Sequence, residues 1–326
     1  MYMIFVYWGI LIVSYFIASR LRNYADKFTY IDKLMMLAIY ILVFIMGLRM
    51  GINEKVLTSI GTIGMQSLVI TLLAIAGSVG AVFIARKLVS MDRYGNIKGS
   101  VAPEESGEKK HVESAIDLKG TLVIVALVAI GVILGKVIIV DHMPDILPWF
   151  SDFAGNLLTW FLCVLIVIIG FELGLSGTVV SNIKKAGLRI LVIPLAIVIG
   201  SFIFGSGAAF LMGFSIKESL AIVGGFGWYS YAPVVISAAG QQYAVASAVA
   251  FMHNVFRETF GIIFIPIFAK KIGYLESLAL PGIGTMDVCM PMVENSCRED
   301  TVAYGFISGF LICILTSAGV PLLMNL

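Results

Sequence analysis

The chain has 326 residues, of which 60% are hydrophobic and only 13% are charged, and its mean hydropathy is +1.00. Soluble globular domains carry about 25% charged residues, so this composition excludes them and predicts an all-α protein that crosses a membrane many times. The net charge of +2 gives no electrostatic reason to expect a nucleic-acid partner. The four cysteines show no C-x-x-C spacing, so we expect no metal site.

Eight stretches are apolar and long enough to span a bilayer, since a spanning helix needs about 20 residues. They cover residues 4–20, 33–50, 62–86, 121–140, 155–174, 190–212, 245–268 and 302–324. The first lacks a basic leading region and a small-residue cleavage site, so we expect a retained span and not a signal peptide. Residues 219–240 and 279–294 are apolar but interrupted by glycine and proline, which predicts broken or re-entrant segments. The sequence leaves open whether these two segments cross the membrane.

Basic residues gather in the loops after the first, third, fifth and seventh spans. Cytoplasmic loops are enriched in lysine and arginine, so we expect these loops in the cytoplasm and both termini outside. The loop after the third span mixes lysines with glutamates, which is typical of a solvated linker.

The linker separates two halves that resemble each other. A shift of 123 positions moves Gly47–Gly51 onto Gly170–Gly174 and Ser78 onto Ser201. In the expected topology the two halves enter the membrane from opposite sides, and inverted repeats with broken helices are characteristic of secondary transporters. The predicted organisation is a first repeat at 1–88, a linker at 89–119, a second, inverted repeat at 120–212 and a C-terminal membrane module at 213–326.

The C-terminal module carries a glycine-rich stretch at 224–233 and then Asn254, Arg257 and Glu258 within an apolar span. A charged side chain inside a span costs about 2.5 to 3.5 kcal/mol, so each one requires a reason. Arg257 and Glu258 point about 100° apart on a helix, so at least one of them needs a partner elsewhere. We predict that Glu258 binds a cationic group or a coupling ion; the alternative is a buried Arg/Glu tie that holds the module together.

Three further carboxylates lie in or beside apolar segments. Asp287 follows Thr285 in a glycine- and proline-broken run, where free carbonyls, the hydroxyl and the carboxylate would suit a cation; a turn with an Asp cap is the alternative. Glu54 follows the second span and alone reads as a loop residue. Glu172 occupies the position equivalent to Arg49, so a structural ion pair between repeats is as favoured as a substrate role.

These motifs resemble the LysO family of bacterial lysine exporters. The resemblance rests on Trp228-Tyr229-Ser230 after the glycines, on Asn254 with Arg257-Glu258, and on the run that ends at Asp287, and it extends over nearly the whole chain. It implies export of L-lysine and analogues such as thialysine across a bacterial inner membrane, in exchange for an inward proton or sodium ion. It also implies that Glu54 and Glu258 are the important carboxylates. Glu54 stands where the family is expected to have Asp, and Gly-Ile-Gly-Thr-Met precedes Asp287 where Gly-Ala-Thr-Ser-Met is expected.

We expect Glu54 and Glu258 to receive the two ammonium groups of lysine, and the N–H groups of residues 225–229 to receive its carboxylate. The complete set of residues predicted to bind substrate or coupling ion is Glu54, Glu258, Asp287, Asn254, Arg257, Thr285, Trp228, Tyr229, Ser230 and Glu172. An exporter of another amino acid or small organic cation is the main alternative. A hydrolase is disfavoured because Ser230 lacks a Gly-x-Ser-x-Gly elbow, so we predict a protein that is not an enzyme and has no cofactor beyond the coupling ion. The sequence leaves a homodimer open.

Overall fold

The computed structural model describes residues 2–22, 24, 28, 30–92, 119–176, 191–286, 288–297 and 299–325, and these residues form helices and turns without a β-strand. The first part of the chain contains α1 (Tyr2–Arg20), α2 (Ile31–Gly51), α3 (Glu54–Thr58) and α4 (Ile60–Leu88). The second contains α5 (Lys119–Leu134), η2 (Gly135–His142), η3 (Pro144–Ile146), α6 (Leu147–Ser176), α8 (Val192–Gly200), η5 (Ser201–Ser206) and α9 (Gly207–Leu211). The last contains α10 (Ile216–Val223), α11 (Ala232–Ala238), η6 (Gln241–Tyr243), α12 (Ala244–Lys271), α13 (Tyr274–Leu278), η7 (Gly282–Met286), α14 (Met290–Ser296) and α15 (Glu299–Asn325).

Seven helical stretches among the described residues are long and apolar enough to cross a membrane. They are Lys33–Gly51, Ile60–Leu88, Val123–His142, Pro144–Phe171, Val192–Leu211, Gln241–Lys271 and Tyr304–Asn325. They coincide with the last seven expected spans, which confirms the prediction of an all-α, multi-pass membrane protein. The first expected span forms the continuous helix α1, which is not one of these seven.

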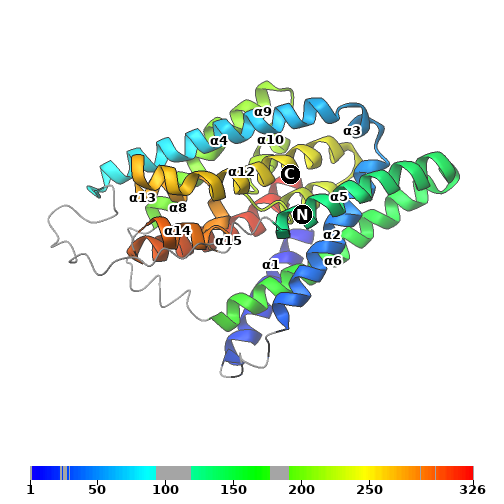
Figure 1. The fold of residues 1–326 in the computed structure, drawn as a ribbon. Coiled ribbons are helices and arrows are strands. Elements are labelled where there is room, and N and C mark those ends of the chain that lie inside the picture. The colour runs from blue at the N-terminus through cyan, green and yellow to red at the C-terminus, as the bar shows by residue number, and fades with distance from the viewer. Residues whose placement is uncertain are drawn as a thin grey trace.

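The helices α1, α2, α5 and α6 form one bundle (Figure 1), in which α1 packs on α6 and α2 packs on α5. Glycines spaced four apart bring α2 close to α5 and to the start of η2: these are Gly47 and Gly51 on α2, Gly131 on α5 and Gly135 at the start of η2. A Cβ atom on Gly47 would lie 2.5 Å from the carbonyl oxygen of Val128, and one on Gly135 would lie 2.5 Å from that of Leu48. Small residues at this spacing let two helix backbones approach closely, so any larger residue would separate α2 from α5.

The remaining long helices form a second group around α4, which packs along α8, η5 and α12 (Figure 1). Gly77 and Gly200 mark the crossing of α4 and α8, because a Cβ on either would lie 2.4 Å or less from the carbonyl oxygen of the other. Beside them, the Oγ atoms of Ser78 and Ser201 are 2.7 Å apart. The 123-position shift superposes Gly77 on Gly200 and Ser78 on Ser201. A two-fold axis between the repeats would bring such equivalent residues into contact. The division into repeats and a C-terminal module stays a prediction.

Both segments expected to be broken are interrupted helices. The first consists of α10 and α11, separated by turns at residues 224–231. In the second, α13 is followed by the short 3₁₀ helix η7 and then by α14. The long helix α12 lies between the two segments in the chain and contacts helices of both, so it is the element that positions the polar residues of the module.

Candidate functional site

A row of polar contacts joins α4 to α12. The hydroxyl of Ser67 donates to the carbonyl oxygen of Val249 at 3.2 Å, and Oγ1 of Thr71 lies 2.9 Å from Nδ1 of His253. The residue numbers of the contacting pairs increase together along both helices, from Ser67 with Val249 to Thr71 with His253, so α12 runs parallel to α4. The hydroxyl-bearing face of α4 is therefore buried against α12 and not turned to lipid.

Asn254, the residue after His253 on α12, holds the first broken segment. Its Oδ1 accepts a hydrogen bond from the N–H of Gly227 at 2.7 Å, and its Nδ2 donates to the carbonyl oxygens of Ala250 at 2.7 Å and Ile222 at 3.4 Å. A Cβ atom on Gly225 would lie 2.6 Å from Nδ2, so the glycine allows this approach. Asn254 is fully buried and fixes the turn between α10 and α11.

Arg257 has four hydrogen bonds to the protein and is fully buried. Its Nη1 donates to Oγ of Ser201 at 2.9 Å and its Nη2 donates to Oγ of Ser78 at 3.0 Å. Nε donates to the carbonyl oxygen of Leu280 at 3.2 Å, and Nη2 also donates to that of Ala279 at 3.2 Å. The guanidinium therefore joins α4, η5 and the second broken segment, which is the geometry of a positioning residue.

The two breaks touch each other directly. The N–H of Ile283 donates to the carbonyl oxygen of Phe226 at 3.0 Å. Gly227 and Gly282 have φ values of +99° and +66°, a region that disfavours residues with a side chain. A Cβ on Gly282 would also lie 2.4 Å from the carbonyl oxygen of Phe226, and one on Gly227 would lie 2.5 Å from that of Pro281. Glycine is required at both positions for the breaks to meet.

Glu258 lies next to Arg257 on α12 and is only 5% exposed. Its main-chain carbonyl oxygen is 4.0 Å from Sγ of Cys289, the residue before α14. A carboxylate buried inside a membrane-spanning helix is expensive and by default marks a functional position. The role of Glu258 in binding a cationic group or a coupling ion stays a prediction.

Glu54 is separated from Glu258, contrary to the expected clamp. It is exposed and begins α3, and the preceding Asn53 donates to the carbonyl oxygen of Gln241, close to the start of α12. Glu258 lies fourteen residues beyond Ala244, or about 20 Å along the helix at 1.5 Å per residue. The structure therefore does not bring the two carboxylates together, and their joint binding of one lysine stays a prediction.

The turns at the two breaks use their main-chain groups internally. The N–H groups of residues 226–229 donate to carbonyls of the same turn or to Asn254, so they do not form the expected open carboxylate site. The carbonyl oxygens of Gly282 and Gly284 accept from the hydroxyl of Thr285 and the N–H of Cys289. Fully buried Thr285 thus closes its own turn, which disfavours the expected set of free carbonyls.

The aromatic residues of the first break pack against neighbouring rings. Trp228 is half-buried and stacks on Tyr231 with ring centroids 4.5 Å apart, and Tyr229 is buried edge-on against Phe251. Ser230 is 5% exposed. These residues line the junction between α10 and α11 and lie beside the segment that Asn254 anchors.

Two predicted site residues fall outside what the structure describes. These are Asp287 and the side chain of Glu172. For the suggested pair between Glu172 and Arg49, the structure gives Arg49 a different partner, because its Nη1 donates to the carbonyl oxygen of Ser237 at the end of α11. Arg49 therefore ties α2 to the first broken segment.

The sequence model of the family described as "Lysine exporter LysO" matches residues 3–100 and 125–326. These two ranges include nearly the whole chain. The chain belongs to the lysine exporter LysO family.

Two curated relatives match this LysO-family chain. It is 26% identical over 175 residues to "Lysine exporter LysO" of Escherichia coli (strain K12), a match that covers 54% of the chain and 56% of that relative. It is 26% identical over 156 residues to "Putative lysine exporter" of Haemophilus influenzae, covering 46% of the chain and 77% of the relative. The chain thus matches little more than half the length of the E. coli protein. No solved structure matches.

The sequence interpretation of this LysO-family chain missed the partners of Arg257. Ser67, Thr71 and Ser78 follow one another at spacings of four and seven residues, which places three hydroxyls on one face of a helix. A polar stripe on an otherwise apolar span was the available signal that α4 faces another polar helix.

Proposed function

We propose that this chain exports L-lysine from the cytoplasm, in exchange for a proton or sodium ion that moves inward. The observation that carries the proposal is the match of residues 3–100 and 125–326 to the lysine exporter LysO family. In support, Glu258 is a buried carboxylate on the helix that contacts both broken segments, whereas the buried Glu276 already pairs with Arg86.

Glu258 is the proposed exchange group. A lysine ammonium and a coupling ion would compete for its carboxylate. Because the carboxylate binds one of them at a time, release of lysine on one side of the membrane is followed by binding of the coupling ion, and the two are exchanged. On the same helix, Asn254 holds the first break and Arg257 holds the second through the hydrogen bonds described above. In this proposal Glu54 acts at the start of α12, on the outer side in the expected topology, where an exposed carboxylate raises the local concentration of the coupling cation before it moves inward.

Energy coupling is required because the substrate is a cation. Moving one positive charge outward against an inside-negative potential costs about 2.3 kcal/mol per 100 mV. A proton or sodium ion that moves inward offsets this cost, which supports exchange over passive release. The proposal includes thialysine, whose charges match those of lysine, and the expected orientation with both termini outside the inner membrane.

Counterflow in proteoliposomes tests the proposal. Vesicles loaded with unlabelled lysine should accumulate labelled lysine saturably, with competition by thialysine, and an imposed pH or sodium gradient should accelerate lysine flux if that ion is coupled. Arginine and ornithine as competitors measure selectivity. Folded protein that moves no lysine under either gradient would refute the proposal.

Glu258→Gln is the informative variant and Glu218→Gln is its matched control. Glu218 is exposed and forms a capping box with Ser215 at the start of α10, so its charge is outside the proposed site. Lysine counterflow should be lost in Glu258→Gln and retained in Glu218→Gln. Counterflow at the unmodified rate in Glu258→Gln would remove this residue from the mechanism.

A further inference from the structure

The C-terminal module contains a second internal repeat, with a shift of 58 positions. Glu218-Ser219-Leu220-Ala221 falls on the identical sequence Glu276-Ser277-Leu278-Ala279, Gly224 falls on Gly282, and Pro233 falls on Pro291. The same shift superposes the bounds of α11 on those of α14 and the start of α10 on that of α13. Sequence and structure therefore agree on one duplicated unit, a broken segment followed by a long helix.

Each broken segment is a hairpin whose two ends lie together. In the first hairpin, residues 216–238, Nζ of Lys217 lies 5.1 Å from the ring centroid of Tyr243, just beyond the end of α11. In the second hairpin, residues 274–296, Oγ of Ser277 lies 3.6 Å from Sγ of Cys297, just beyond α14. Neither segment continues to the opposite end of the molecule.

The two hairpins enter from opposite ends of α12. The first hairpin leads into the start of α12, and the second begins immediately after α12 ends. Their tips meet where the N–H of Ile283 donates to the carbonyl oxygen of Phe226. Two re-entrant segments thus approach each other from the two sides of the expected membrane and meet beside Arg257, which donates to the second of them.

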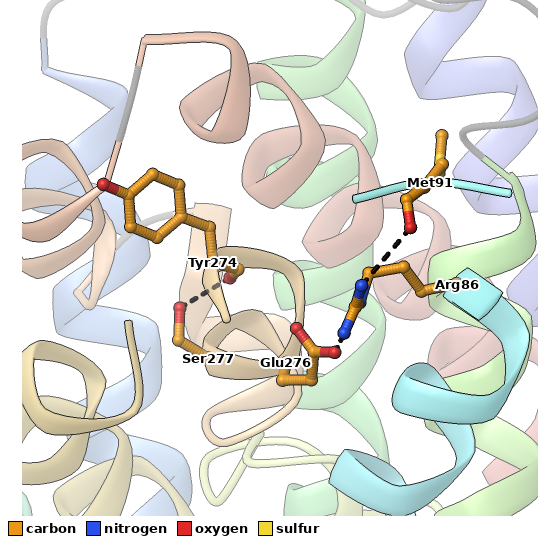
Figure 2. A network of polar contacts seen from close by, with 5 residues as sticks. All are labelled: Arg86, Met91, Tyr274, Glu276 and Ser277. Carbon is orange, nitrogen blue, oxygen red and sulfur yellow. Dashed lines mark hydrogen bonds and ion pairs between the residues drawn. The ribbon is translucent and has the colours of Figure 1, made fainter. Parts of the chain in front are cut away.

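The equivalent glutamates of the two hairpins have different surroundings. Glu218 is exposed and its carboxylate bonds to Ser215 of its own helix start. Glu276 is fully buried, and its Oε1 lies 2.6 Å from Nε of Arg86 near the end of α4. Figure 2 shows this pair, with Arg86 also donating to the carbonyl oxygen of Met91. Of these two equivalent glutamates, it is the one in the second hairpin that forms a buried ion pair with α4.

We propose that the second hairpin is the gate at the Arg86 end of the transport pathway, and that Arg86 and Glu276 are the positioning residues that hold it shut. The inference rests on the proposed transport function, and it adds the residues that control access of substrate to the transport pathway. Separating Glu276 from Arg86 leaves two uncompensated buried charges, so the second hairpin opens only when both become solvated. The first hairpin has no such pair at its equivalent glutamate and opens more easily. In the expected topology the Arg86 end is cytoplasmic.

Native cysteines report the opening of the second hairpin. Cys297 is 1% exposed and lies at the base of that hairpin, whereas Cys313 is 2% exposed within α15. The full-length protein in proteoliposomes is treated with a maleimide, and mass spectrometry measures the modification rate at each cysteine separately. Glu276→Gln should increase the rate at Cys297 by about tenfold or more, since it breaks a buried charge pair, and should leave the rate at Cys313 unchanged.

Glu218→Gln is the matched control and should leave the rate at Cys297 unchanged. The exchanged variant Arg86→Glu/Glu276→Arg restores the opposite charges and should return the rate at Cys297 toward the unmodified value. The proposal is overturned if Glu276→Gln leaves Cys297 unreactive, if Glu218→Gln exposes Cys297 equally, or if Cys297 and Cys313 become reactive together, as in general unfolding. The labelling needs no substrate, so its result does not depend on lysine transport. An absence of lysine flux would refute the proposed function, and the cysteine labelling would still test the gate.

Discussion

Replacing Arg257 by leucine should destabilise the fold strongly, and the structure allows the magnitude to be worked out. The hydroxyls of Ser78 and Ser201 would keep their bond to each other. The carbonyl oxygens of Ala279 and Leu280 would lose the donors described above and remain buried. An unsatisfied buried acceptor costs about 1 to 3 kcal/mol, so Arg257→Leu should lower the free energy of unfolding by about 2 to 6 kcal/mol.

Arg257→Lys separates a positioning role from a substrate role. Lysine keeps the charge, but one ammonium cannot reproduce the planar fork that serves four acceptors in different directions. Unfolding in SDS, followed by circular dichroism, should show Arg257→Lys between the unmodified protein and Arg257→Leu. Unmodified stability in both variants, with only the KM for lysine raised, would refute the positioning role and favour direct contact with the substrate.

Three further predictions concern the same module. Glu258→Gln should abolish lysine counterflow and leave the folded fraction unchanged in the same preparations; flux at the normal rate would contradict the exchange role. Gly227→Ala and Gly282→Ala should each lower the free energy of unfolding by at least about 1 to 2 kcal/mol, because a side chain is strained at positive φ, whereas Gly64→Ala, with open space around it, should be neutral or slightly stabilising. Equal SDS unfolding midpoints for these three variants would argue against tight contact between the breaks. Glu54→Gln should raise the external concentration of the coupling ion that gives half-maximal lysine export, with little change in the maximal rate, and a loss as complete as that of Glu258→Gln would argue against their separation.

The helices of this chain were predictable because the bilayer imposes both length and apolarity on a span. Seven expected spans match described helices to within a few residues, apart from Leu147–Ser176, which begins earlier than the expected 155–174. The glycine and proline interruptions at 219–240 and 279–294 also predicted real breaks. In each case the signal is local, since it depends on residues that are neighbours in the chain.

The site was less predictable because its contacts are made between distant elements. The sequence indicated that Arg257 needs a partner, but its acceptors come from α4, η5 and the segment after α13. For a related reason, the sequence could not show that Glu54 and Glu258 lie apart in this structure. Sequence gives spacing along the chain and not depth in the bundle, and the contact of Asn53 with Gln241 places Glu54 at the start of α12, far from its middle.

The 58-position duplication shows that the residues that hold the two hairpins lie on one of the two long helices. Under this shift Asn254 and Arg257 of α12 fall on Ile312 and Leu315 of α15, and Glu258 falls on Thr316, so the second copy lacks the amide, the guanidinium and the carboxylate of the first. Two hairpins that meet tip to tip need only one helix to hold both, because Asn254 anchors the first and Arg257 anchors the second. A second polar helix would bury further unpaired groups at a cost without holding any additional segment. The duplication therefore supplies two hairpins of similar shape, while the difference between α12 and α15 leaves α12 as the helix that anchors both of them.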